Sequence, residues 1–268
     1  MSKTTVIVSC PIDTYSGYGA RSRDFVKALM DLGKYDVKVL SQRWGNTRFG
    51  YLEAHEEREL SSIVIDKITA KPDVWVQVTV PNEFQKVGTY NIGLTAGIET
   101  TICDPSWIEG CNRMDLVMTS SEHAKKVFNE SKFKTKEGRV VELSTPVEVL
   151  FEGVDLNKYF PTEERTELSN DLDNIKESFC FLFVGHWLQG KLGHDRKNVG
   201  WTVQQFFEAF KNKKNAPALI LKTQHANASI SDRNTLIKKV NEIKAKIGGT
   251  LPNVYILHGE ISDKEINS

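Results

Sequence analysis

The sequence predicts an α/β protein built from two doubly wound parallel-sheet domains, the second of them incomplete. Short apolar runs of strand length alternate along the chain with segments whose apolar residues recur at helical spacing. The alternation restarts after the polar, charged stretch 160–176, which we interpret as a linker or a short exposed helix. The predicted domains are therefore 1–160 and 161–268.

The first domain opens with a strand, a helix and a second strand. The apolar run 5–9 is followed by a loop rich in Gly and Tyr, then by a helix in which Phe25, Val26 and Leu29 share one face, then by the run 36–40. Such a βαβ unit implies parallel pairing and a right-handed crossover. Further strands are expected at 73–80, 89–94, 116–120 and 147–151, and a helix at 122–129.

The second domain shows fewer elements. Strands are expected at 179–184, 218–221 and 254–257, and helices at 201–210 and 234–247. Sheets of this class usually carry about five or six strands. The chain stops at 263–268 in what looks like the start of a helix. We therefore expect this domain to be cut short.

Composition favours an ordinary globular protein, with 40% hydrophobic and 26% charged residues. Lys plus Arg and Asp plus Glu both number 35, and this balance gives no sign of a protein that holds nucleic acid by phosphate neutralisation alone. The four cysteines lack the spacing of zinc sites or disulfide frameworks. Neither a signal peptide nor a membrane-length apolar run is visible, so we expect a cytoplasmic protein with reduced thiols and no transmembrane segment.

Cationic residues follow the first strand of the second domain, and Lys222 ends the next strand. Carboxyl ends of parallel strands meet at one edge of a sheet, where open α/β sheets bind ligands. Cationic side chains there suit a diphosphate, although a solvated loop is the alternative interpretation. The loop residues are His186, Lys191, His194, Arg196, Lys197 and Asn198.

Two weaker signals lie in the first domain. Gly17, Tyr18 and Gly19 form a G-x-G loop between the first strand and helix, which suits either an anion site or simply a tight turn. Glu99 follows the strand 89–94 and is a candidate base, although a lone loop glutamate is more often structural. The D-x-D at 171–173 falls in the polar stretch, so no metal site is predicted.

Three stretches in family order resemble the GT-B glycosyltransferases of the retaining family 4-like group, also called group 1 glycosyl transferases. They are 107–128 (WIEGCNRMDLVMTSSEHAKKVF), 149–161 (VLFEGVDLNKYFP) and 181–210. The second is the most specific, being similar to the inter-domain "pnGVD…F.P" signature. The resemblance implies two facing Rossmann-like domains with a cleft between them, the acceptor mainly on the first and the sugar nucleotide mainly on the second.

The resemblance also implies roles for single residues. Arg196 and Lys197 match the cations that hold the donor diphosphate and stabilise the leaving group, and Glu99 matches an acceptor-side glutamate of some relatives. We therefore expect Arg196, Lys197 and Glu99 to be catalytic. The expected donor-binding residues are Gly17, Tyr18, Gly19, His186, Lys222, Gly259, Glu260 and Ile261, the last three at the nucleotide base.

The sequence departs from the family in three places. His186 stands where a basic residue, often Arg, is usual, and the insertion 188–195 separates it from Arg196. The family's later E…GxG…E motif would have to follow Ser268. If the chain ends there, we expect weak or no transferase activity.

The leading hypothesis is transfer of a sugar from a nucleotide-diphosphate sugar to an unidentified hydroxyl acceptor. Retention is implied by the resemblance alone, and neither a metal nor a cofactor other than the donor substrate is expected. A non-catalytic nucleotide- or sugar-binding remnant of such an enzyme is the alternative. A Rossmann dehydrogenase is disfavoured because the third glycine and the downstream acid of the dinucleotide fingerprint are missing. A nucleic-acid acceptor is not indicated, and the sequence does not specify the oligomeric state.

Overall fold

The computed structural model describes residues 3–188, 193–195, 197–225, 228–262 and 264–267. The chain divides into two compact units, Met1–Gly153 and Val154–Ser268. The sequence-based division was placed at 160/161, within the extended segment that follows β9 (Val147–Val149). Each unit has its own sheet and its own core.

Unit 1 is built on a seven-stranded parallel sheet. The chain runs outward from β1 to β2 and β3, then returns to the opposite side of β1 with β4 and continues to the other edge. Loops leaving β1 and β4 therefore separate at a topological switch point, where sheets of this type bind ligands. The strands, in spatial order, are β3 (Val64–Ile65), β2 (Tyr35–Ser41), β1 (Thr4–Cys10), β4 (Val74–Val78), β5 (Tyr90–Thr95), β6 (Leu116–Thr119) and β9.

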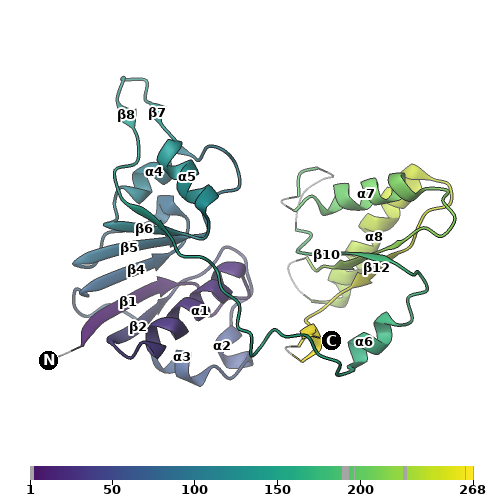
Figure 1. The fold of residues 1–268 in the computed structure, drawn as a ribbon, viewed down its shortest axis with the longest axis horizontal. Coiled ribbons are helices and arrows are strands. Elements are labelled where there is room, and N and C mark those ends of the chain that lie inside the picture. The colour runs from purple at the N-terminus through teal and green to yellow at the C-terminus, as the bar shows by residue number, and fades with distance from the viewer. Residues whose placement is uncertain (1–2, 189–192, 196, 226–227, 263, 268) are drawn as a thin grey trace. The chain divides into compact units, whose positions relative to one another are not determined.

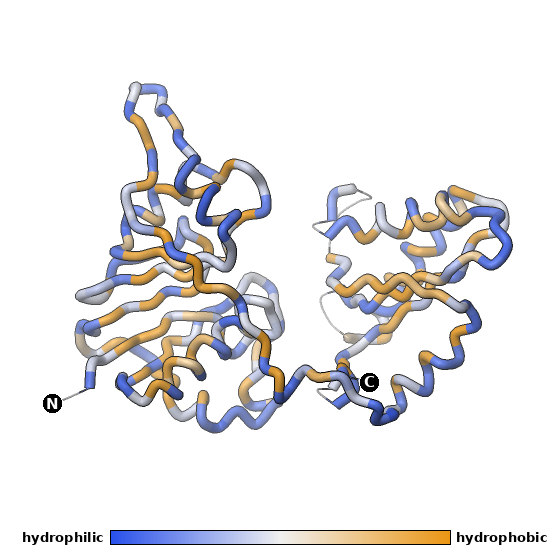
Figure 2. Tube along the Cα trace, in the orientation of Figure 1, coloured by the Kyte–Doolittle hydropathy of each residue, from blue (hydrophilic) through white to orange (hydrophobic). Residues whose placement is uncertain are grey.

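Helices cover both faces of this sheet (Figure 1). On one face α1 (Gly17–Asp31), α2 (Tyr51–Ala54) and α3 (Arg58–Ser62) enclose a core around Val8, Val26 and Leu60. On the other, the 3₁₀ turn η1 (Pro81–Glu83), α4 (Pro105–Cys111) and α5 (Glu122–Glu130) enclose a core around Ile108 and Phe128. The strands are apolar on both sides, as buried parallel strands require (Figure 2).

A small antiparallel hairpin projects from unit 1 beside α4 and α5 (Figure 1). Its strands are β7 (Phe133–Lys134) and β8 (Val140–Val141), and Gly138 takes a positive φ of 86° in the turn. This hairpin is not predicted by the sequence pattern, because strands of two residues carry no detectable alternation.

Unit 2 begins with α6 (Glu167–Leu172), a short helix within the stretch predicted to be a linker or a short exposed helix. Its sheet has β10 (Cys180–Val184), β11 (Ala218–Lys222) and β12 (Val254–Leu257) in parallel, in that order. The longer helices are α7 (Val199–Phe210) and α8 (Ile230–Ile247), and the 3₁₀ turn η2 (Glu265–Asn267) follows β12. The helix predicted at 234–247 begins earlier because Ser229 caps it.

One core holds unit 2 together. Both α7 and α8 pack on the same face of the sheet, around Phe207, Leu221 and Leu236. On the opposite face Leu182 and Val184 of β10 are 66% and 67% exposed. The second sheet therefore has three strands and one covered face in the part of the chain that the structure describes. None of the helices searched over the described residues is long and apolar enough to cross a membrane.

Candidate functional site

The three strands of unit 2 stay joined beyond their carboxyl ends. The amide of Gly185 donates to the carbonyl of Lys222 (3.1 Å), and the amide of Trp187 donates to the carbonyl of Gln224 (3.0 Å). On the other side, the amide of Thr223 donates to the carbonyl of Leu257 (3.2 Å). The segments carrying the predicted residues His186, Lys222 and Gly259 are thus brought to one edge, which we call the strand-end edge.

Lys197 reaches the same edge although it lies in the following loop. A Cβ added to Gly185 would stand 3.8 Å from Lys197 Cγ and 3.1 Å from the ring of Phe183. The Lys197 side chain therefore lies beside Gly185, just after the end of β10, and the residue is exposed to solvent. Its predicted partner Arg196 lies outside the described residues. Lys197 gives the strand-end edge an exposed cation.

Lys222 ties β11 to β12. Its Nζ donates to the carbonyl of Gly259 at the end of β12. Burial lowers the pKa of Lys222, and the neighbouring Glu260 carboxylate partly opposes that shift. An anion bound at this amine would favour its charged form in the same way. The half-buried amine, which has N–H groups beyond the one donated to Gly259, is therefore a candidate partner for a phosphate.

Gly259 presents open backbone at this edge. Its φ is 110°, a conformation that residues with a Cβ rarely adopt, and an added Cβ would meet no atom within 4 Å. A ligand can therefore approach the main chain closely here, and the predicted base-side residues Glu260 and Ile261 continue from it. Glu260 is exposed and Ile261 is half-buried.

The amino end of α7 is occupied by the protein's own carboxylate. Asp195 is 3% exposed and accepts hydrogen bonds from the amides of Val199 (2.7 Å) and Gly200 (3.4 Å). An anion at this edge must therefore be held mainly by side chains rather than by this helix terminus. Asp195 was expected within the insertion 188–195, although an aspartate shortly before an apolar helix is a capping signal.

Gly17, Tyr18 and Gly19, predicted to form a loop, lie in the first turn of α1 because Ser16 caps the helix there, and one of the two glycines is committed to packing. Ser16 caps α1 by accepting from the amide of Gly19 (2.9 Å), and a Cβ on Gly19 would lie only 2.3 Å from the carbonyl oxygen of Thr14. Gly17 differs, because a Cβ there would meet nothing within 4 Å. Gly19 therefore lets α1 approach the preceding turn closely, and Gly17 remains the open position.

Tyr18 joins the first turn of α1 to the loop after β5, which carries Glu99. Its hydroxyl lies 3.1 Å from Thr95 Oγ1 and accepts from the amide of Ala96 (3.1 Å). Burial raises the pKa of Tyr18, so the phenol stays protonated. Its ring stacks on Trp44 with centroids 4.0 Å apart. Tyr18 therefore acts as a strut for the loop after β5, on which Glu99 is exposed.

Comparison with known proteins relates this architecture to solved structures. No protein-family model matches the chain, and no curated protein matches it. A structure described as "OtsA apo structure" has a TM-score of 0.52 and 11% identity, covering 98% of this chain and 75% of that one. An alpha,alpha-trehalose-phosphate synthase (UDP-forming) from Burkholderia vietnamiensis gives 0.51 and 10%, with 99% and 74% covered.

A third structure is described as "Trehalose-6-phosphate from E. coli bound with UDP-2-fluoro glucose", with a TM-score of 0.51, 11% identity, and coverage of 98% of this chain and 75% of that one. These matches run through both units. The chain has the GT-B fold. The prediction of two Rossmann-like domains is confirmed, and at this identity the likeness establishes the fold alone.

Within the GT-B fold, the predicted residues form two groups. In unit 2 the structure brings together His186, Lys197, Lys222 and Gly259. In unit 1, Tyr18 connects the helix turn of Gly17 and Gly19 to the loop of Glu99. Trp44, which stacks on Tyr18, was not predicted, because a tryptophan shortly after a strand end is not by itself a signal for a site.

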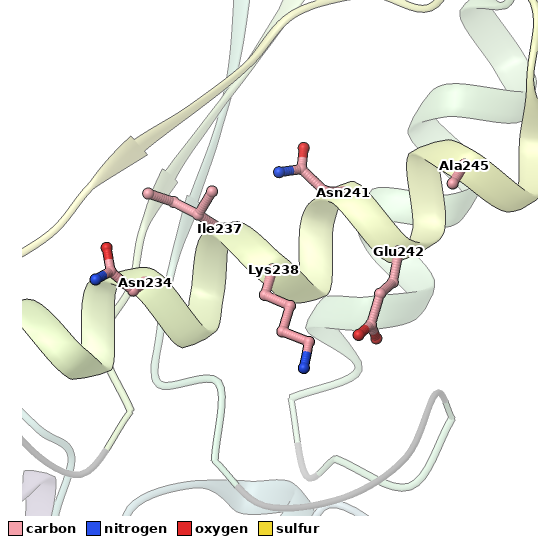
Figure 3. Close-up of a pocket in the computed structure, with 6 residues that line it drawn as sticks. All are labelled: Asn234, Ile237, Lys238, Asn241, Glu242 and Ala245. Carbon is pink, nitrogen blue, oxygen red and sulfur yellow. The ribbon is translucent and has the colours of Figure 1, made fainter.

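A shallow groove of about 530 Å³ lies elsewhere, along the outer side of α8 (Figure 3). All its lining residues come from that one helix and project outward: Asn234, Ile237, Lys238, Asn241, Glu242 and Ala245. It contains none of the predicted residues. Over the described residues, no three His, Cys, Asp or Glu side chains gather in a way that could hold a metal ion.

Proposed function

We propose that the protein is a glycosyltransferase that moves a sugar from a nucleotide-diphosphate sugar to a hydroxyl acceptor. The observation that carries the proposal is the strand-end edge of unit 2, to which Lys197, Lys222 and the open backbone of Gly259 contribute. A diphosphate and its nucleoside need this combination of cations and accessible main chain. A UDP-sugar is the first donor to test, since one similar structure is described as bound to a UDP-sugar analogue and another as UDP-forming.

The cations would act on the leaving group. As the bond from the sugar's anomeric carbon to the diphosphate breaks, negative charge develops on the departing oxygen, and a new bond forms to the acceptor oxygen. Lys197, together with Arg196, would stabilise that charge. Lys222 would do so from a half-buried position, where a charge interaction is stronger than in water. The proposal therefore assigns to side chains the role that a metal ion plays in other transferases.

The acceptor would bind mainly on unit 1, and its hydroxyl proton must leave as the new bond forms. Glu99 is exposed on the loop after β5 and is proposed to orient or deprotonate that hydroxyl. Tyr18 would hold this loop in place through Ala96. Retention of configuration is part of the proposal and is supported by the family resemblance.

The test is a thermal-shift screen of nucleotide sugars, followed by an assay for release of nucleoside diphosphate with sugar acceptors and with water. Specific binding stabilises the native state by mass action. We expect at least one nucleotide sugar to raise the melting temperature and to yield free nucleoside diphosphate. Stabilisation without release would favour the non-catalytic binding protein, and no stabilisation by any nucleotide sugar would contradict the proposal.

A further inference from the structure

A buried carboxylate lies behind the strand-end edge. Asp232, in the first turn of α8, is 9% exposed. Its Oδ2 accepts from the backbone amide of His225 (2.8 Å) and lies 3.1 Å from Nε2 of His258. Its Oδ1 lies 3.6 Å from Nδ1 of His225. The His258 side chain is itself 8% exposed, so this contact is removed from solvent.

This carboxylate connects segments that are distant in sequence. His225 belongs to the segment after β11, whose Gln224 carbonyl receives the Trp187 amide from the loop after β10. His258 follows β12 and directly precedes Gly259. One side chain on α8 is therefore bonded to both segments that extend the sheet beyond Lys222 and Leu257.

Capping of α8 does not explain where the Asp232 carboxylate makes its hydrogen bonds. Ser229 and Asp232 have the S-x-x-D spacing of a capping box, in which the acid would bond back to the amide of the cap residue. The serine half is present, since Ser229 Oγ accepts from the Asp232 amide (3.2 Å). The acid is instead bonded to His225 and His258. Burying a carboxylate costs free energy unless it is hydrogen-bonded. The hydrogen bonds to His225 and His258 offset that cost only while both segments stay in place.

We propose that Asp232 is a positioning residue for nucleotide recognition, which fixes the backbone at 258–261 against the segment 222–225. The inference rests on the proposed function, because it assumes that this edge binds a nucleoside diphosphate. Asp232 itself need not touch the ligand. Without it, the segment 258–261 is held against 222–225 only by the Lys222–Gly259 and Thr223–Leu257 hydrogen bonds, and both affinity and discrimination among bases decrease.

The experiment measures UDP, GDP and ADP binding by calorimetry for Asp232→Ala, Asp232→Asn and His258→Gln. We expect Asp232→Ala to weaken the best-bound nucleotide at least tenfold and to reduce the ratio between the best and worst. Asp232→Asn should retain most of the affinity, because its amide still accepts from the His225 amide and can pair with His258. Ser229→Ala is the matched control, since it removes the cap of α8 and leaves the Asp232 carboxylate in place. It should lower the melting temperature while leaving the affinity ratio unchanged.

Hydrogen exchange distinguishes a failure of the positioning role from a failure of the proposed function. We expect amides at 223–225 and 258–261 to exchange faster in Asp232→Ala, or in His258→Gln if the alanine variant does not fold. Unchanged exchange there, or equal loss of affinity in Ser229→Ala, would overturn the positioning role. If the wild-type protein binds none of the three nucleotides, the proposed function fails, and the nucleotide part of this inference fails with it.

Discussion

Glycines lie near the carboxyl ends of strands in both sheets, but their surroundings differ between the two units. In unit 1 the first turn of α1 is largely engaged with the protein itself. Gly19 packs against Thr14, and Tyr18 is hydrogen-bonded to the loop after β5. In unit 2 the loops present Lys197 to solvent and leave the backbone of Gly259 open. Glycines near strand ends therefore differ between the units: Gly19 packs against the protein itself, whereas Gly259 leaves its backbone open.

The units also differ in how firmly the edge is supported. Unit 1 has a core on each face of its sheet, whereas unit 2 has a single core on one face in the described part of the chain. The strand-end edge of unit 2 accordingly depends more on its own hydrogen bonds, from the extended ladder to the Asp232 contacts. We therefore expect substitutions at the edge in unit 1 to change mainly the free energy of unfolding, and substitutions at the strand-end edge of unit 2 to change mainly nucleotide affinity.

The largest effect is expected at Gly19. Gly19→Ala places a Cβ against the Thr14 carbonyl oxygen and should reduce the free energy of unfolding by about 3 kcal/mol, at the upper end of overpacking costs. Gly17→Ala is the matched control, since its Cβ would meet open space, and it should change stability by less than about 1 kcal/mol. Urea denaturation measures both. Equal stability of the two variants would remove the packing role of Gly19.

At the strand-end edge of unit 2, Lys197→Ala should weaken nucleoside diphosphate binding about tenfold or more, equivalent to about 1.4 kcal/mol of binding free energy. The reason is loss of the exposed cation beside Gly185. Unfolding free energy should hardly change. Lys214→Ala, an exposed lysine on the loop after α7, is the control and should bind normally. Calorimetric titration decides, and unchanged affinity in Lys197→Ala would remove this residue from the site.

A smaller effect is expected at Tyr18. Tyr18→Phe deletes the hydroxyl that receives the Ala96 amide, and should cost about 1 kcal/mol of stability. Because this bond holds the Glu99 loop, transfer to the acceptor should slow while nucleotide affinity stays constant. Tyr90→Phe, at an exposed position of β5, is the control. A change in nucleotide affinity alone would mean that Tyr18 contacts the donor.

The smallest effect concerns the thiols. Burial raises the pKa of Cys10 and of Cys111 to about 12 each, so both remain protonated and unreactive near neutral pH. Cys180, at the start of β10, is only partly buried. Under native conditions a thiol reagent should label Cys180 first, as read by mass spectrometry, without altering stability. Rapid labelling of Cys10 or Cys111 in the folded protein would contradict their burial.

The sequence predicted much of the fold and part of the candidate site. Alternating strands and helices identified both sheets, and strand ends pointed to Lys222, because these patterns are local. It could not predict that Asp232 meets His258, a contact between residues 26 positions apart. Such contacts depend on how separate elements pack. The role of Gly19 likewise became visible only once the Thr14 carbonyl was placed.

The most direct test of the central claim is hydrogen exchange of the wild-type protein with and without saturating UDP. The account predicts slower exchange at 185–187, 222–225 and 258–261, the three segments that meet at the strand-end edge of unit 2. Protection confined to other parts of unit 2, such as the outer side of α8, or no change at these segments when UDP is bound, would contradict it.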